Sequence, residues 1–165
     1  MANAQKPPPA PQKPMTATHK WPRPENLELE FGTIEVDRQF CPSARWEART
    51  LAYMSTPFPL EFFFRPGAFA QGVLCNKNVR RSLSKIFGEI HRIPADERIA
   101  KGLSVIYGCY LPLHMIGGIL SPHAWGAAIS LGRGAEAVKI LAPLFEAEEW
   151  QSFGKEKRGI FMAVS

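Results

Sequence analysis

A run of thirty-one residues, from 102 to 132, contains no Asp, Glu, Lys or Arg, and this run constrains the fold more than any other feature. It is longer than a membrane-spanning helix requires, but Pro112, Pro122, two histidines and repeated glycines interrupt it. Because the run is not continuously apolar, we do not expect it to span a membrane. An uncharged segment of this kind has to be buried without a long helix, which predicts a folded sheet with tight turns.

Hydrophobic periodicity on both sides of this run predicts an α+β domain. Residues 76–94 repeat apolar side chains at helical spacing, with Asn76 or Asn78 as the N-cap and Pro94 at the end. Residues 134–150 form a second helical segment, which we expect Pro143 to kink or divide. Short segments rich in β-branched and aromatic residues indicate strands at 103–111, 117–120, 127–131 and 159–165, with a strand or packed loop at 57–67, a short helix near 94–102 and a turn region at 121–126. The order predicts a small, mainly antiparallel sheet flanked by helices.

The first 24 residues differ in composition from the remainder of the chain. They hold seven of the fifteen prolines and four basic residues, but no Asp or Glu. With few aliphatic side chains to bury, they are expected to form an extended Pro-rich arm, residues 1–24, ahead of one domain, residues 25–165. The domain itself carries sixteen basic and fifteen acidic residues and is nearly neutral, so we expect no specific nucleic-acid binding.

The cysteines and the N-terminus bear on location. Cys41, Cys75 and Cys109 are widely spaced and odd in number, which favours buried free thiols over a disulfide framework. The N-terminal residues lack the apolar core of a signal peptide, so we expect synthesis in the cytoplasm.

The stretch SPHAWGAAIS, residues 121–130, carries a resemblance to a known family. It matches the signature Ser-x-His-x-x-Gly-x-Ala-x-Asp at Ser121, His123, Gly126 and Ala128, and departs from it at Ser130. In this respect the chain resembles the D-alanyl-D-alanine carboxypeptidase and L-alanyl-D-glutamate endopeptidase metallopeptidases, zinc enzymes that cleave peptidoglycan and include many phage endolysins. The order of segments from about residue 19 to the end is also similar, which implies a peptidoglycan-peptidase-like fold.

The resemblance also implies that most of the catalytic site is missing. His123 matches the first zinc ligand, but Ser130 stands where the family has Asp, and Phe161 stands at the expected third ligand, a His. Leu113 takes the place of a substrate-binding Arg, and no acid follows Glu156 to serve as the catalytic base. A catalytic zinc needs three protein ligands and an open position for water, so we expect no metal and no catalysis.

Two other interpretations of these residues stay open. His123, with Ser121 and Trp125, can line a vestigial pocket that still binds peptidoglycan, or His123 can be a hydrogen-bonded core residue. Alternatively, His114 and Cys109 can join His123 in an improvised zinc site, which would make the chain an active peptidoglycan peptidase with atypical ligands.

The favoured interpretation is a catalytically inactive domain with a structural role. Because the family is common among phage lysis and tail proteins, the resemblance implies a virion component such as a tail, baseplate or capsid accessory protein. The partners expected are other protein subunits, contacted through the Pro-rich arm.

Overall fold

The computed structural model describes residues 22–153 and 158–163, and within them the chain is an α+β fold, as predicted. The helices are α1 (Pro24–Phe31), α2 (Ala44–Thr50), α3 (Arg80–His91), α4 (Ala95–Ala100) and α5 (Ala135–Glu146), with a 3-10 turn, η2 (Pro122–Trp125). The strands are β1 (Leu51–Phe62), β2 (Phe69–Asn76), β3 (Val105–Gly108), β4 (Met115–Ile116), β5 (Ile119–Leu120), β6 (Ala128–Leu131), β7 (Gln151–Ser152) and β8 (Gly159–Met162). Residues 1–21 of the predicted arm lie outside the described residues, and Pro24, the last residue of that arm, begins α1.

The described strands form one main sheet in the order β2-β1-β3-β6-β8-β7 and a separate small hairpin, β4–β5. Every neighbouring pair in the main sheet is antiparallel except β1 and β3, which run parallel. The predicted sheet is therefore confirmed as mainly antiparallel, and the uncharged run supplies β3, the small hairpin and β6. No helix among the described residues is both long and apolar enough to cross a membrane.

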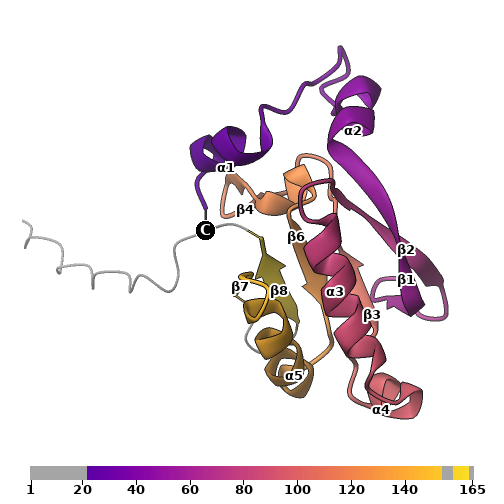
Figure 1. Ribbon diagram of the computed structural model, residues 1–165. Helices are drawn as coiled ribbons and strands as arrows, with labels where there is room; N and C mark the ends of the chain where they lie inside the picture. Colours follow the sequence, from indigo (N-terminus) through magenta and orange to yellow (C-terminus); the bar gives the residue numbers. More distant parts are fainter. Residues whose placement is uncertain (1–21, 154–157, 164–165) are drawn as a thin grey trace, which may run out of the picture.

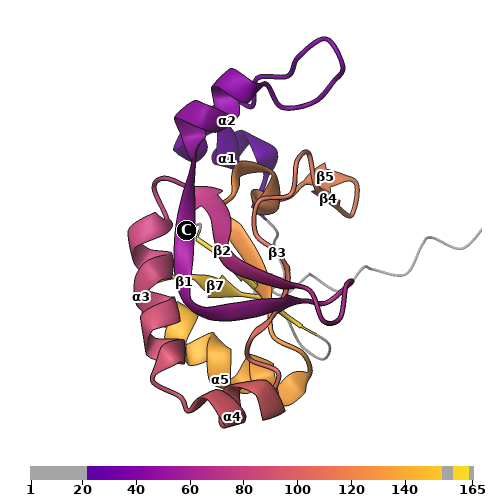
Figure 2. The same cartoon turned by 90° about the vertical axis from the view of Figure 1, so that its right-hand side faces the viewer.

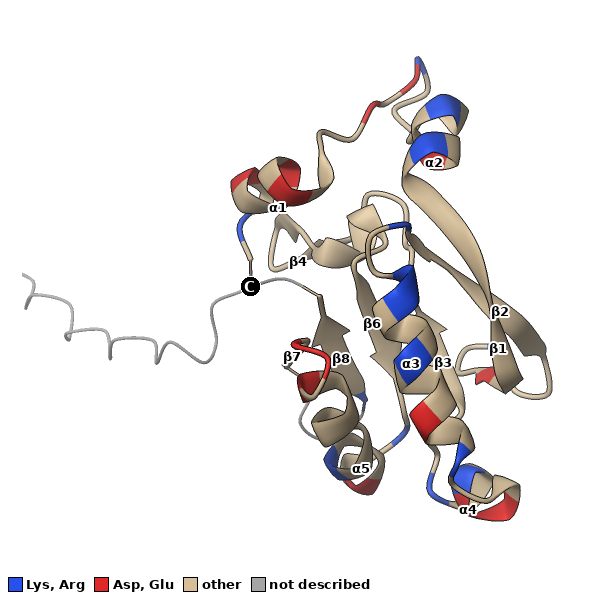
Figure 3. Cartoon of the chain, in the orientation of Figure 1, with Lys and Arg blue, Asp and Glu red and all other residues tan. Residues whose placement is uncertain are grey.

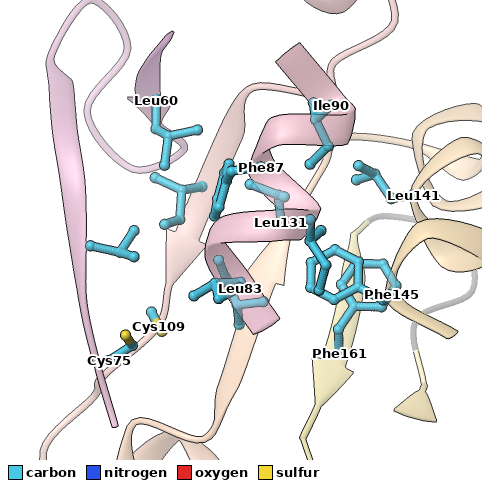
Figure 4. Close-up of a cluster of buried hydrophobic side chains, with 14 of the residues drawn as sticks. Leu60, Cys75, Leu83, Phe87, Ile90, Cys109, Leu131, Leu141, Phe145 and Phe161 are labelled. Carbon is cyan, nitrogen blue, oxygen red and sulfur yellow. The ribbon is translucent and has the colours of Figure 1, made fainter. Parts of the chain in front are cut away.

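Helices α3 and α5 pack side by side on one face of the sheet (Figure 1). The apolar residues predicted for α3 are buried as expected, namely Leu83, Ile86, Phe87 and Ile90. They meet side chains of β1, β3, β6 and α5 in the main core, part of which Figure 4 shows. The Lys and Arg residues of α3, whose places along the helix Figure 3 marks in blue, are exposed and form a solvated surface.

The opposite face of the sheet is covered only in part. Figure 2 shows the β4–β5 hairpin on the side away from α3, with α1 and α2 at one end of the domain. A second buried cluster lies at that end and includes Leu27 of α1, Trp46 of α2, Trp125 of η2 and Met162 of β8. The Ser43 side chain accepts a hydrogen bond from the Trp46 backbone N–H and caps α2.

Two local predictions need correction. Pro143 does not divide the second helical segment, because α5 runs through it to Glu146. The proline lies in the last turn of the helix, where its missing N–H leaves one carbonyl for water to satisfy. Neither Asn76 nor Asn78 is the N-cap of α3, because Val79 is the N-cap residue and no side chain caps the helix. The Asn76 side chain instead accepts from the Asn78 backbone N–H at 2.9 Å and donates to the Trp125 carbonyl oxygen at 3.0 Å.

Candidate functional site

The turn η2 sets the position of His123. Pro122 begins the turn, and Gly126 ends it with φ +69°, a left-handed conformation that favours glycine. A Cβ on Gly126 would lie 2.7 Å from the backbone nitrogen of Asn76, so a side chain would also clash there. The chain then enters β6, whose Ser130 faces away from the helices. As a result, His123 and Ser130 meet beneath the turn.

The His123 imidazole is bonded on both sides by serine hydroxyls. Its Nε2 lies 2.9 Å from the Ser130 Oγ, and its Nδ1 lies 3.2 Å from the Ser121 Oγ. The Ser121 Oγ also lies 2.7 Å from Nδ1 of His114, whose ring meets the His123 ring edge-on at 5.0 Å between centroids. These contacts form one continuous hydrogen-bonded chain from the half-buried His114 to the buried Ser130.

This hydrogen-bonded chain is closed off from solvent at its inner end. The exposed fraction is 1% for His123 and 3% for each of the two serines. Burial, followed by the nearby charges of His114 and Arg158, lowers the pKa of His123 from its ordinary 6.5 to about 3. Burial and Arg158 also lower the pKa of His114. At neutral pH, His123 is therefore a neutral imidazole with one donor and one acceptor, which two hydroxyls satisfy.

The arrangement offers little to a metal ion. In the part of the chain that the structure describes, no group of three or more His, Cys, Asp or Glu side chains is placed to hold one. The improvised set of His114, His123 and Cys109 does not come together. Cys109 belongs to the core beneath the helices, where Figure 4 shows it next to Cys75. Burial raises the pKa of Cys109 well above its usual value, so its thiol stays protonated.

The predicted third ligand position requires a correction of register. Ser130 pairs with Ile160 across β6 and β8, whereas Phe161 pairs with Ile129. Side chains of directly paired residues share a face of the sheet, so Ile160 is the residue level with Ser130. Phe161 points into the helical layer and stacks on Phe145, with the ring centroids 3.9 Å apart. Phe161 therefore does not occupy a vestigial ligand position.

The other predicted site residues occupy different environments. Trp125 is fully buried and its indole N–H donates to the Gly32 carbonyl oxygen at 2.7 Å, so it is a core residue rather than the lining of a binding pocket. Leu113 has a left-handed φ of 51° in the turn before His114 and is half-buried. The cation that acts on the two histidines is Arg158, which also lies 4.8 Å over the Tyr107 ring.

Two features of this site are not marked in the sequence. The Ser121–His114 contact depends on the β4–β5 hairpin, which returns the chain so that the Ser121 N–H donates to the His114 carbonyl oxygen. Arg158 lies just before β8 and acts across β6, so nothing in its local sequence marks it. The only signal available was the pairing of β6 with β8, which brings residues thirty apart in the chain into register.

Comparison with known proteins gave no match to a family model, to a curated protein sequence or to a solved structure.

Proposed function

We propose that this chain is a catalytically silent, peptidase-like domain that serves as a structural subunit of an assembly. The observation that carries the proposal is the state of His123. A metal ligand must present a free nitrogen lone pair toward an open position, but both nitrogens of His123 face buried serine hydroxyls. The neutral hydroxyl of Ser130 cannot supply the charge that a carboxylate ligand would bring to a cation.

His123 and Ser130 are also poorly suited to act as a general base and a nucleophile in hydrolysis. A general base near neutral pH needs a pKa close to the working pH, and that of His123 lies at about 3. A nucleophile must reach a substrate carbonyl, whereas the Ser130 side chain is turned inward and is 3% exposed. The side chains of the site instead form a hydrogen-bonded network, which is what a buried polar cluster requires in order to be stable. Its members are His114, Ser121, His123 and Ser130.

An assembly role is supported by the composition of the N-terminal segment. The Pro-rich first 24 residues are too poor in apolar side chains to fold alone and are suited to lie over another subunit. We place the protein in a phage virion, as a tail, baseplate or capsid accessory subunit, because the family that it resembles is common among phage lysis and tail proteins.

The catalytic part of the proposal is tested by metal analysis and hydrolysis. Purified protein, loaded with zinc and then desalted, is expected to hold far less than one zinc per chain and to release no fragments from purified cell walls. The His123→Ala variant should show the same two results, as should the matched control His91→Ala on the exposed side of α3. Stoichiometric zinc that is lost in His123→Ala but kept in His91→Ala would overturn the proposal.

The assembly part is tested independently. Mass spectrometry of purified phage particles is expected to find the chain in fixed copy number, bound through salt-resistant contacts. Retention of the purified chain on cell walls, abolished by His123→Ala, would instead favour the peptidoglycan-binding function.

A further inference from the structure

A pocket of about 510 Å³ lies away from His123, between the end of α4, the start of α5 and the strands β1, β2 and β3. Its apolar lining includes Phe69 of β2, Ile99 of α4 and Val105 of β3. Phe69 and Ile99 are 55% and 73% exposed, which is unusual for large apolar side chains that flank one pocket. Nothing in the described chain covers them.

Aromatic rings continue this apolar lining along the same face of the sheet. Phe63 follows the pocket residue Glu61 by two positions in the chain, and its ring stacks on that of Tyr107 at 4.1 Å. Phe64 meets both rings edge-on and is 74% exposed. The guanidinium of Arg133, which lines the pocket, lies 5.5 Å over the Phe63 ring. The pocket and this aromatic group therefore form one continuous surface.

The charges in the pocket leave two carboxylates available. Both basic residues of the lining are engaged, since Lys101 binds Glu97 at 2.6 Å and Arg133 lies on an aromatic ring. Glu61 and Glu136 also line the pocket, and neither takes part in an ion pair among the described residues. The hydrogen bond and the charge of Glu97, followed by the charge of Glu136, raise the pKa of Lys101. A ligand that combines apolar rings with positive charge fits this surface.

We propose that residues 5–14 of one copy of this chain, QKPPPAPQKP, bind in this pocket of a second copy. The inference rests on the proposed assembly function and names the contact. Proline-rich segments dock as polyproline II helices in grooves lined by aromatic rings, because their stiff backbone loses little entropy. Lys6 and Lys13 flank the prolines in a segment without acids, which complements Glu61 and Glu136.

The position of α1, which follows the Pro-rich segment in the chain, favours a neighbour's pocket over the chain's own. Figures 1 and 2 both place α1, which follows the arm, toward the end of the domain opposite α4. Residues 15–21 join the Pro-rich segment to the described chain and span at most about 25 Å when extended. A domain of this size is about 40 Å across, and a path over its surface is longer still. Docking in a second copy avoids this detour.

Sedimentation velocity of the full-length chain across a wide concentration range tests the proposal. The average mass is expected to rise with concentration. A pocket variant, Phe69→Ser with Ile99→Ser, and an arm variant, Pro8→Ala with Pro9→Ala, should each weaken self-association by about tenfold or more. Both pocket side chains are exposed, so the fold should tolerate their loss. The control Leu29→Ser, at an exposed apolar residue of α1, should associate as the wild type does.

Mixing the two variants separates exchange between copies from binding within one chain. The arm variant keeps an intact pocket and the pocket variant keeps an intact arm, so a 1:1 complex is expected only from their mixture. If the pocket variant associates as the wild type does and the arm variant does not, the pocket is excluded as the binding site of the arm. Assembly through the arm would then still be supported. If the wild-type chain stays monomeric, the proposed contact between copies is wrong. Recovery of the chain in purified phage particles would still support the proposed function.

Discussion

The buried histidine should make the domain sensitive to mild acid. His123 is neutral in the folded chain because its pKa is lowered from 6.5 to about 3, whereas in the unfolded chain it regains its ordinary value. Between these two values the unfolded state binds one more proton than the folded state. Protonation of His123 in the unfolded chain therefore leaves the free energy of unfolding unchanged above about pH 6.5. Below that value, the free energy of unfolding decreases as the pH falls toward 3.

The size of this effect follows from the pKa difference. Each pH unit in the window costs at most about 1.4 kcal/mol per proton, so lowering the pH from 7 to 4.5 should remove about 2–3 kcal/mol. That is a large fraction of the stability of an ordinary domain, typically about 5–15 kcal/mol. The predicted decrease is larger than the effect of most exposed charges.

Urea unfolding at pH 7.0, 5.5 and 4.5, monitored by tryptophan fluorescence, measures the decrease in the free energy of unfolding. The wild type is compared with His123→Gln, which removes the titrating ring, and with His91→Gln, which removes an exposed imidazole from α3. We expect His123→Gln to be less stable at pH 7 but to lose about 2–3 kcal/mol less than the wild type on acidification. Parallel pH profiles for the wild type and His123→Gln would refute a buried, neutral imidazole.

Three further outcomes follow from the geometry. The variant Ser130→Asp with Ile160→His should bind zinc detectably more tightly than Ser130→Asp with Phe161→His, because only the first pair of residues shares a face of the sheet. Calorimetry measures the two zinc affinities, and equal values would contradict the register of β6 and β8. Gly126→Ala should destabilise the domain by about 2–4 kcal/mol in thermal unfolding, because of its positive φ and the close backbone beside it. A thiol reagent should modify one cysteine, Cys41, quickly in the native protein, and rapid reaction of all three would show that the core is open.

The sequence predicted those parts of the fold that local pattern determines. The apolar stripe of Leu83, Phe87 and Ile90 predicted the buried face of α3, and β-branched residues located β3 and β6. The helices α1 and α2 were missed because they are short and mostly exposed, with Leu27 and Trp46 as their buried residues. Strand β2 was missed because Gln71 and Gly72 interrupt its apolar residues.

At the candidate site, the sequence identified the residues but not their contacts. His123, Ser121 and Ser130 were all marked by the motif, and the structure brings them within hydrogen-bonding distance. Their burial depends on how β6 pairs with β8 and how the β4–β5 hairpin folds back, which are long-range events. A shift of one residue in that pairing exchanges Ile160 for Phe161, and no local pattern decides it.

The bond between the Trp125 indole and the Gly32 carbonyl has a mechanical consequence for a protein held by its N-terminal arm. A pulling force on the arm reaches α1 first, and this hydrogen bond joins the segment after α1 to the turn η2, together with the burial of Leu27. We expect residues 22–50 to detach and unfold before the sheet unfolds, which lengthens the chain by about 100 Å. In optical-tweezer traces, Trp125→Phe should lower the force of that first step and leave the later one unchanged; a single step for the whole domain would exclude such a breakaway segment.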